Sequence, residues 1–257
     1  MNRSVSIMIT TTIGREQVLY WVVKHLCKDI PIPFHLYLYN DHANPLNTTL
    51  LKIINEEKRN DIKLVVYNDL GKLNTKKIGC GGARHFLFEQ VKRNHDIVIS
   101  LDDDMQLKPK WLENIMLAMD KFPKHCVFTG VVRRNDGSIQ MAGSNFKIEN
   151  KTLYRTENQK ILPLSKYHIT EWGPMGCLAF CRSALTEPCI IPPLYIRDDA
   201  AFYLLLRRFG INETVVVPES EAIHKPFPVP SSNLRLKEEM EKEVIYFKKV
   251  HGLTFGY

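Results

Sequence analysis

The chain has 257 residues, a formal net charge of +7 and a pI near 9.0, which favours polyanionic partners without identifying one. Its 44% hydrophobic and 25% charged residues are ordinary for a globular protein and argue against a disordered or low-complexity chain. The length fits one sizeable α/β domain with a short appendage.

The first half alternates short β-rich runs with longer helical patterns, which is typical of βαβ units and a mostly parallel sheet. Strands are expected at 4–10, 34–39, 62–67 and 96–101. Helices, whose apolar residues recur at helical spacing, are expected at 15–28, 45–59 and 82–93. The last of these strands, DIVISL, runs directly into three aspartates.

The second half has a different character. Further strands are expected at 125–133, 175–181 and 214–217, and helices at 109–121, 198–209 and 234–250. The segment 135–143 contains an Asp-Gly turn and predicts a hairpin, whereas 144–171 reads as irregular and polar. A Pro-rich run at 226–230 predicts a linker before the last helix. We therefore expect an α/β fold: a mixed, mostly parallel central sheet flanked by helices, with a C-terminal helical tail.

Three loops of the first half follow strands and so lie at their carboxyl ends. They span 10–15, 40–44 and 102–107. In open α/β sheets, ligands collect in the crevice outside these ends. The function of the chain is therefore expected at this edge of the sheet.

The strongest local signal is ISLDDDMQ, in which a hydrophobic strand delivers Asp102, Asp103 and Asp104 to a loop. Three adjacent carboxylates repel one another, so they need a cation or several hydrogen-bond donors nearby. Mg²⁺ and Mn²⁺ prefer oxygen ligands and commonly bridge carboxylates to substrate phosphates. The alternative is a solvated acidic turn that caps the helix beginning near residue 109.

Six segments stand in a recognisable order along the chain. They are VSIMITTTIGREQVLYWVVKHL, LYLYNDHANPLNTTLL, GCGGARHFLFEQ, ISLDDDMQLKPKWLENI, WGPMGCLAFCRSAL and YIRDDAAFYLLLRRFG. Together they resemble the family-two group of glycosyltransferases with the GT-A (Rossmann-like) fold, from about residue 5 to residue 224. The resemblance implies a catalytic domain at 1–225, with a nucleotide-sugar-binding half at 1–107 and an acceptor-side half at 108–225, followed by a linker and helix at 226–257.

The resemblance also implies donor-binding residues in the first half. Thr10, Thr11 and Arg15 would border the nucleobase and the ribose. Asp41 would contact the base, and Arg84 would contact the base or the phosphates.

The acidic strand end would complete the donor site. By resemblance, Asp102 would face the ribose or a metal-bound water, Asp104 would bind a divalent cation directly, and Asp103 would also lie on the donor. His224 resembles a late histidine that completes the metal site; an exposed or internally bonded histidine is the alternative. The pair Asn40-Asp41 stands where two aspartates are commoner in the family, and Thr10-Thr11-Thr12 replaces a Pro-Thr-Tyr-like turn. These departures leave the identity of the base open, although uridine is still the favoured base.

On the acceptor side, the resemblance makes Asp199 the base that removes the acceptor's proton. Asp198 and Asp199 open a helix, so a capping role is the alternative for both. Trp172, Gly173 and Gly176 would lie along the acceptor wall, where Trp172 offers an apolar face to a sugar ring. Core packing is the alternative for Trp172.

The function expected is metal-dependent, inverting transfer of a sugar from a nucleotide-diphosphate donor, with a UDP-sugar favoured and Mn²⁺ or Mg²⁺ as the cofactor. One rival is a nucleotidyltransferase on a related fold; however, the glycine-rich basic loop that such enzymes favour is missing from TTTIGRE. A second rival is a non-catalytic protein that binds sugar nucleotides. The acidic residues at 102–104 and 198–199 are all present, which argues against a protein that has lost catalytic activity.

The acceptor is expected to be a glycan or a lipid-linked glycan, with a peptide or, less favoured, a nucleic acid as alternatives. The apolar stretch near the start is too short to span a bilayer, and no cleavage site follows it, which predicts a cytoplasmic protein with at most peripheral membrane contact. The six cysteines form no C-x-x-C pair, which predicts reduced thiols. The C-terminal helix is expected to pack against the chain or to form a homo-oligomer contact.

Overall fold

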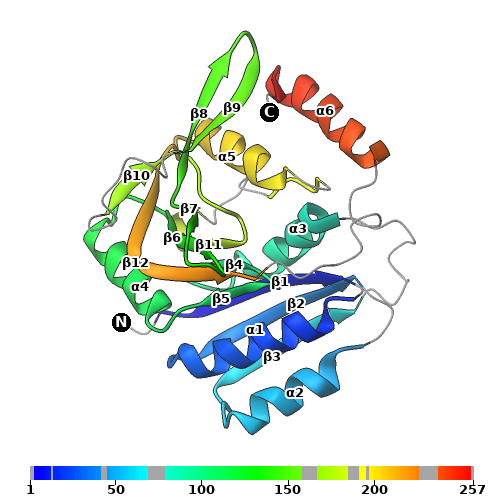
Figure 1. Cartoon of the computed structure of the whole chain (residues 1–257), viewed down its shortest axis with the longest axis vertical. Helices are drawn as coiled ribbons and strands as arrows, with labels where there is room; N and C mark the ends of the chain where they lie inside the picture. The colour runs from blue at the N-terminus through cyan, green and yellow to red at the C-terminus, as the bar shows by residue number, and fades with distance from the viewer. Residues whose placement is uncertain are drawn as a thin grey trace.

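The structure of the protein is a computed structural model. The residues that it describes are 3–12, 14–41, 45–68, 79–157, 167–184, 191–194, 197–225 and 237–255. A ten-stranded mixed sheet runs through the molecule, and helices cover both of its faces (Figure 1). The expected fold class is confirmed: the sheet is mixed and mostly parallel, and it is flanked by helices.

The first half forms a parallel block in the order β4-β1-β2-β3. Its elements are β1 Val5–Thr12, α1 Glu16–Asp29, β2 Phe34–Asp41, α2 Asn47–Glu56, β3 Ile62–Asn68, α3 Gly79–Val91 and β4 Ile97–Asp102. All of them were expected from the hydrophobic periodicity, with ends that differ by a few residues.

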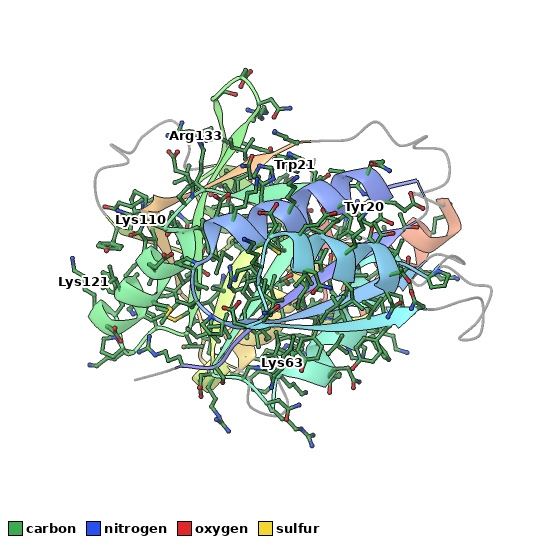
Figure 2. The ribbon with its side chains drawn as sticks, turned by 90° about the horizontal axis from the view of Figure 1, so that it is seen from below. Tyr20, Trp21, Lys63, Lys110, Lys121 and Arg133 are labelled. Carbon is green, nitrogen blue, oxygen red and sulfur yellow. The ribbon has the colours of Figure 1, made fainter. Side chains whose placement is uncertain are left out.

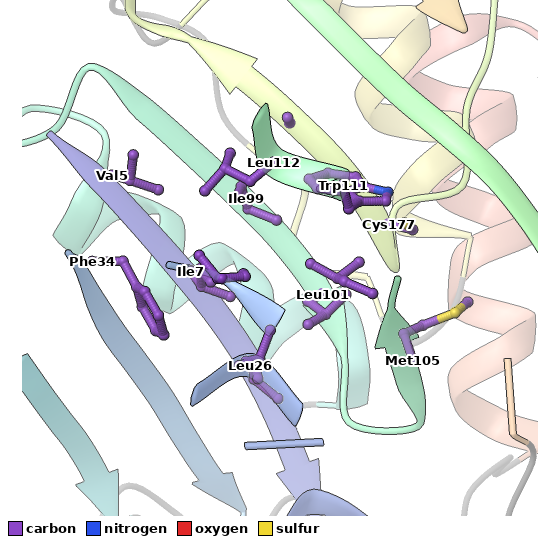
Figure 3. Packing of buried hydrophobic residues seen from close by; sticks show 14 of the residues in the cluster. Val5, Ile7, Leu26, Phe34, Ile99, Leu101, Met105, Trp111, Leu112 and Cys177 are labelled. Atoms are coloured by element: carbon purple, nitrogen blue, oxygen red, sulfur yellow. The ribbon is translucent and has the colours of Figure 1, made fainter. Parts of the chain in front are cut away.

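Strand β1 is buried on both faces because helices cover each side of the sheet. Ile7 and Ile9 point into a cluster shared with α1 and α2, whereas Met8 points into a second cluster shared with α3. Figure 3 shows part of the first cluster, with Leu26 of α1 among strand side chains. The two helices α1 and α2 lie in front of the sheet in Figure 2. The alternation of side chains along a strand thus produces two cores, one for each face.

The second half adds antiparallel strands to the block. Strand β11 (Cys177–Cys181) lies between β4 and β6 (Val127–Arg134) and is antiparallel to both, and β12 (Thr214–His224) lies parallel to β6. The remaining elements of this region are β5 Met105–Leu107, α4 Trp111–Lys121, β7 Ile139–Met141, β10 His168–Thr170, the short helix η1 Arg182–Ala184 and α5 Asp198–Arg208. The hairpin expected at 135–143 is confirmed as β6–β7.

Strand β12 is much longer than expected, because it continues through the polar run PESE that hides its second half in the sequence. A register shift between Val216 and Glu221 absorbs this run. The continuation carries His224 to the carboxyl edge of β4, opposite Met105 of the short strand β5. Sequence reasoning missed both β5 and this extension.

The expectation of an irregular segment at 144–171 was wrong. Strands β8 (Ser144–Glu149) and β9 (Thr152–Glu157) form an antiparallel hairpin, and β13 (Thr254–Phe255) adds to β9. Asn150 and Lys151 form the turn, both with positive φ, at 48° and 61°. Such turns usually contain glycine, so a turn without it was not recognised.

The C-terminal helix α6 (Lys237–His251) packs beside the β8–β9 hairpin (Figure 1). Its Phe247 is fully buried in the second core cluster. The Pro-rich run 226–230 lies outside the described residues, and the domain division at 225 stays a prediction. No helix in the described part of the chain is long and apolar enough to cross a membrane.

Candidate functional site

Several of the predicted donor residues meet where β1, β2 and β4 end. Parallel pairing sets Thr10 opposite Asp102, and Thr12 opposite Asp41 at the end of β2. The Thr10 hydroxyl lies 3.6 Å from the sulfur of Cys80 in the first turn of α3. The strand ends therefore form one continuous edge, as the ligand crevice of an open α/β sheet requires.

Asp103 and Asp104 share one guanidinium. Arg15 Nε donates to both oxygens of Asp103 at 2.8 Å, and its Nη2 lies 2.5 Å from Asp103 Oδ1 and 2.6 Å from Asp104 Oδ2. The Thr11 hydroxyl donates to Asp103 Oδ2 at 2.7 Å. Part of the positive charge that three adjacent carboxylates need therefore comes from Arg15, which follows β1 and binds two of the carboxylates through its guanidinium.

The two carboxylates differ in their protonation. Burial raises the pKa of Asp103 to about 6, although Arg15 and Thr11 act against the shift. Burial also acts to raise the pKa of Asp104, but His224 and Arg15 outweigh it, so that this pKa is lowered. Asp104 is therefore the more firmly ionised of the pair, which suits it better to hold a cation.

His224 faces Asp104 from the end of β12. Its Nε2 lies 3.4 Å from Asp104 Oδ2, and its Nδ1 lies 2.8 Å from Gln140 Oε1 on β7. A histidine that binds a metal commonly gives its other ring N–H to a carbonyl oxygen, which fixes the tautomer and the ring orientation. The hydrogen bond to Asp104 raises the pKa of His224.

These residues fit a divalent cation that takes most of its ligands from a substrate. A carboxylate oxygen and an imidazole nitrogen suit Mn²⁺, and Gln140 supplies the outer support. Within the described residues, no group of three or more His, Cys, Asp or Glu side chains is arranged to hold a metal. Asp104 and His224 alone offer only two ligands, so a cation held here would need further oxygen ligands from elsewhere.

A pocket of about 370 Å³ lies beside His224. The residues that line it come from the β6–β7 hairpin and β12: Arg134, Asn135, Asp136, Gln140 and His224. Sequence reasoning predicted the hairpin from its Asp-Gly turn but did not place it beside His224. Only the pairing of β6 with β12, which sets Arg134 opposite His224, brings the two together.

A second cluster centres on Arg84 of α3. Its Nη1 lies 2.7 Å from Asp198 Oδ2, and its Nη2 bonds Asp102 Oδ1. Arg84 is 7% exposed and Asp198 is 4% exposed. Because Asp198 is the first residue of α5, this bridge places the amino end of α5 next to the acidic end of β4.

Asp199 is partly buried, and its Oδ1 accepts a 2.7 Å hydrogen bond from the amide of Ala200. Burial raises its pKa to about 6, and the neighbouring Asp198 adds to the shift. A carboxyl group with this pKa changes protonation close to neutral pH, as a general base requires. The contact with a first-turn amide also agrees with the helix-end alternative, so the catalytic role of Asp199 stays a prediction.

The other acceptor-side residues occupy different settings. Gly176 backs onto the Asp102 carboxylate, and its carbonyl accepts a 3.0 Å hydrogen bond from the Asp102 amide. Trp172 is 5% exposed and stacks on Phe146 with ring centroids 4.9 Å apart, so it packs in the core. Gly173 lies against side chains of the sheet. Of these, only Gly176 touches the acidic cluster.

Comparison with known families and structures adds to this geometry. The family model described as Glycosyl transferase family 2 matches residues 8–182. No curated protein matches the chain.

Solved structures show the same fold at low sequence identity. The chain is similar to residues 1–349 of S. aureus TarS in complex with UDP-GlcNAc, with a TM-score of 0.62 and 16% identity over 95% of this chain and 66% of that chain. It is also similar to the mannosyltransferase PcManGT from Pyrobaculum calidifontis in complex with GDP-Man and Mn²⁺, with a TM-score of 0.61 and 13% identity over 90% of this chain and 59% of that one. The chain thus spans about two thirds or less of their lengths.

Proposed function

Because the chain belongs to glycosyl transferase family 2, we propose that it moves a sugar from a nucleotide-diphosphate donor to an acceptor by direct displacement at the anomeric carbon. The observation that carries this proposal is the meeting of Asp104 and His224 at the end of β4, beside Arg15. Paired anionic and imidazole ligands next to a guanidinium suit a diphosphate that carries a cation.

The donor is a UDP-sugar in this proposal. The complex of TarS with UDP-GlcNAc supports it through similarity of fold, whereas the PcManGT complex contains GDP-Man. Thr10, Thr11 and Asp41 lie along the edge where the resemblance sets the nucleoside. Arg84 is engaged with Asp102 and Asp198, so its contact with the base or the phosphates is not part of the proposal.

Asp104 and His224 would hold the cation, Mn²⁺ or Mg²⁺, with Gln140 orienting the histidine. When bound, the cation offsets the negative charge that develops on the departing diphosphate. The PcManGT complex with Mn²⁺ supports this assignment. Arg15 bonds the same Asp104 oxygen, so its side chain has to share that carboxylate or move when a cation binds.

Asp199 takes the proton of the acceptor as the acceptor atom attacks. The bond from the acceptor to the anomeric carbon forms while the bond from that carbon to the diphosphate oxygen breaks, on the opposite face of the sugar. The configuration at this carbon is therefore inverted. Support comes from the raised pKa of Asp199 and from its position beside Asp198, which the Arg84 bridge ties to the donor edge.

We propose a glycan or a lipid-linked glycan as the acceptor. Its site includes the region near Gly176 and the amino end of α5. A cytoplasmic location, with peripheral contact at a membrane when the acceptor is lipid-linked, belongs to the same proposal.

A panel of sugar nucleotides tests the function directly. With Mn²⁺ present, we expect release of a nucleoside diphosphate from one donor, and loss of this release with a chelator. Asp104→Ala should abolish it. Asp120→Ala, which removes an exposed carboxylate on α4, should leave it unchanged. Release of pyrophosphate instead would identify a nucleotidyltransferase, and no release from any donor would contradict the proposal.

A further inference from the structure

Arg84 is a buried cation between two carboxylates that belong to different halves of the site. It lies on α3, whereas Asp102 ends β4 and Asp198 begins α5. Each terminal nitrogen of the guanidinium bonds one of these carboxylates. The planar fork of an arginine therefore sets the separation of Asp102 and Asp198.

Two glycines allow this arrangement. A Cβ on Gly176 would lie 2.9 Å from Asp102 Oδ1 and closer still to Oδ2, so any side chain there would displace the carboxylate. A Cβ on Gly81 would lie 2.6 Å from the Cβ of Asp198 and would also overlap the carbonyl of Leu194. The backbone is therefore in direct contact with both carboxylate-bearing residues, which leaves them little room to move.

The charge of Arg84 is permanent. Burial acts to lower its pKa, but Asp198 and Asp102 outweigh burial and raise the pKa above its usual value. Its Nε is buried and finds no hydrogen-bond partner within the described residues. Both terminal nitrogens of the side chain are directed at carboxylates.

The residue after Asp198 is the proposed base. The groups that act on the pKa of Asp199 are Asp198 on its own helix, Arg84 from α3 and Arg155 from β9, and Tyr203 of α5 lies within its electrostatic reach. Asp198 raises this pKa, whereas the two arginines lower it. Burial is the largest cause of the raised pKa of Asp199, and Asp198 and Arg84 act on this pKa in opposite directions.

We propose that Arg84 is a positioning residue that clamps the donor-side Asp102 and the acceptor-side Asp198 into one unit, and so holds Asp199 in place against the donor. This inference rests on the proposed glycosyl transfer. It differs from the donor contact that the family resemblance implies for Arg84, because both terminal nitrogens are already engaged by protein carboxylates. Arg84 acts on the reaction through Asp102 and Asp198 rather than by touching the donor.

The test is a double-mutant cycle of Arg84→Met and Asp198→Asn, with kcat, donor KM and the pH dependence of kcat measured for each variant. We expect Arg84→Met to lower kcat about 100-fold through misplacement, with a much smaller change in donor KM. The double variant should be no worse than the worse single variant, because both changes break the same unit.

The pH profiles separate positioning from simple loss of stability. Arg84→Met should move the acid limb of kcat to higher pH, and Asp198→Asn should move it to lower pH, because the two residues act on Asp199 with opposite charge. Arg84→Lys keeps the positive charge but loses the planar guanidinium, so it should lower kcat and leave the acid limb of the pH profile unchanged. This variant replaces Arg84→Met in the test if Arg84→Met does not fold.

Arg59→Lys is the matched control, because Arg59 is a partly buried arginine that donates to backbone carbonyls away from the site. Arg59→Lys should lower the Tm without shifting the acid limb of the pH profile of kcat. Normal kcat and an unmoved limb in Arg84→Met, or additive losses in the double variant, would overturn the inference while glycosyl transfer stands. A wild-type chain that neither transfers nor hydrolyses any sugar nucleotide would overturn both.

Discussion

His224 and Asp104 face each other across the antiparallel pair of β5 and β12, with His224 Nε2 lying 3.4 Å from Asp104 Oδ2. Gln140 bonds the other ring nitrogen and so directs Nε2 at the carboxylate. Residues from two strands, β7 and β12, and from the turn between β4 and β5 thus converge on a place where a carboxylate and an imidazole can share one cation.

The support from Gln140 predicts a change in metal affinity. Gln140→Leu removes the partner of His224 Nδ1, so the Mn²⁺ concentration for half-maximal activity should rise about 10-fold or more. Activity should recover at high Mn²⁺, because the ligands themselves remain. Gln90→Leu, on the exposed side of α3, is the control. An unchanged Mn²⁺ dependence in Gln140→Leu would remove His224 from the metal site.

The contact between Gly176 and Asp102 predicts a steric effect. Gly176→Ala would press on the Asp102 carboxylate, so we expect weaker donor binding and a loss of stability of about 1–3 kcal/mol, as for other overpacked sites. Gly173→Ala is the graded control, since its Cβ would meet Thr129 and Leu178 at 3.1–3.2 Å. Donor titration and denaturant unfolding of both variants provide the comparison. Equal losses of donor affinity and of stability in the two variants would show that the contact between Gly176 and Asp102 has no particular effect on donor binding.

Asp199 predicts the pH dependence of the reaction. With its pKa raised to about 6, we expect kcat to rise with pH through that value, because the proposed base must be ionised to accept a proton. Asp199→Asn should lower kcat about 10²- to 10⁴-fold and abolish this limb. If Asp199→Asn keeps near-normal transfer while Asp104→Ala loses it, the base is another residue.

The same group predicts how stability depends on pH. The folded-state pKa of Asp199 lies above the value of about 3.9 in an unfolded chain, so its stabilising contribution is fully present below pH 3.9 and is lost as the pH rises through 6. Asp199→Asn should therefore unfold at higher denaturant concentration than the wild type at pH 7.5. The difference should shrink towards pH 4. A constant difference across this range would contradict the raised pKa.

The β8–β9 turn predicts a gain in stability away from the site. Lys151 has a φ of 61°, which costs a residue with a side chain about 1–2 kcal/mol. Lys151→Gly should therefore raise the Tm, and Lys151→Val should lower it. Activity should not change in Lys151→Gly. A lower Tm in Lys151→Gly, at unchanged activity, would mean that contacts of the lysine side chain outweigh the backbone strain.

Local patterns in the sequence predicted the first half of the fold well. In that half, apolar residues at strand and helix spacing decide each element, and both faces of β1 and β4 are buried. The β8–β9 hairpin was missed because its turn, Asn150-Lys151, contains no glycine. The end of β12 was missed because a polar run interrupts its apolar pattern where the register shifts.

By itself, the sequence determined that a buried strand ends in Asp102, Asp103 and Asp104, because an apolar run followed by adjacent carboxylates is a local pattern. Only the tertiary structure decided which cations meet them: Arg15 reaches two of the three, and Arg84 ties the third to Asp198. These pairings join residues far apart in the chain. Strand order and glycine-permitted close approach bring them together, and neither is encoded in any single segment.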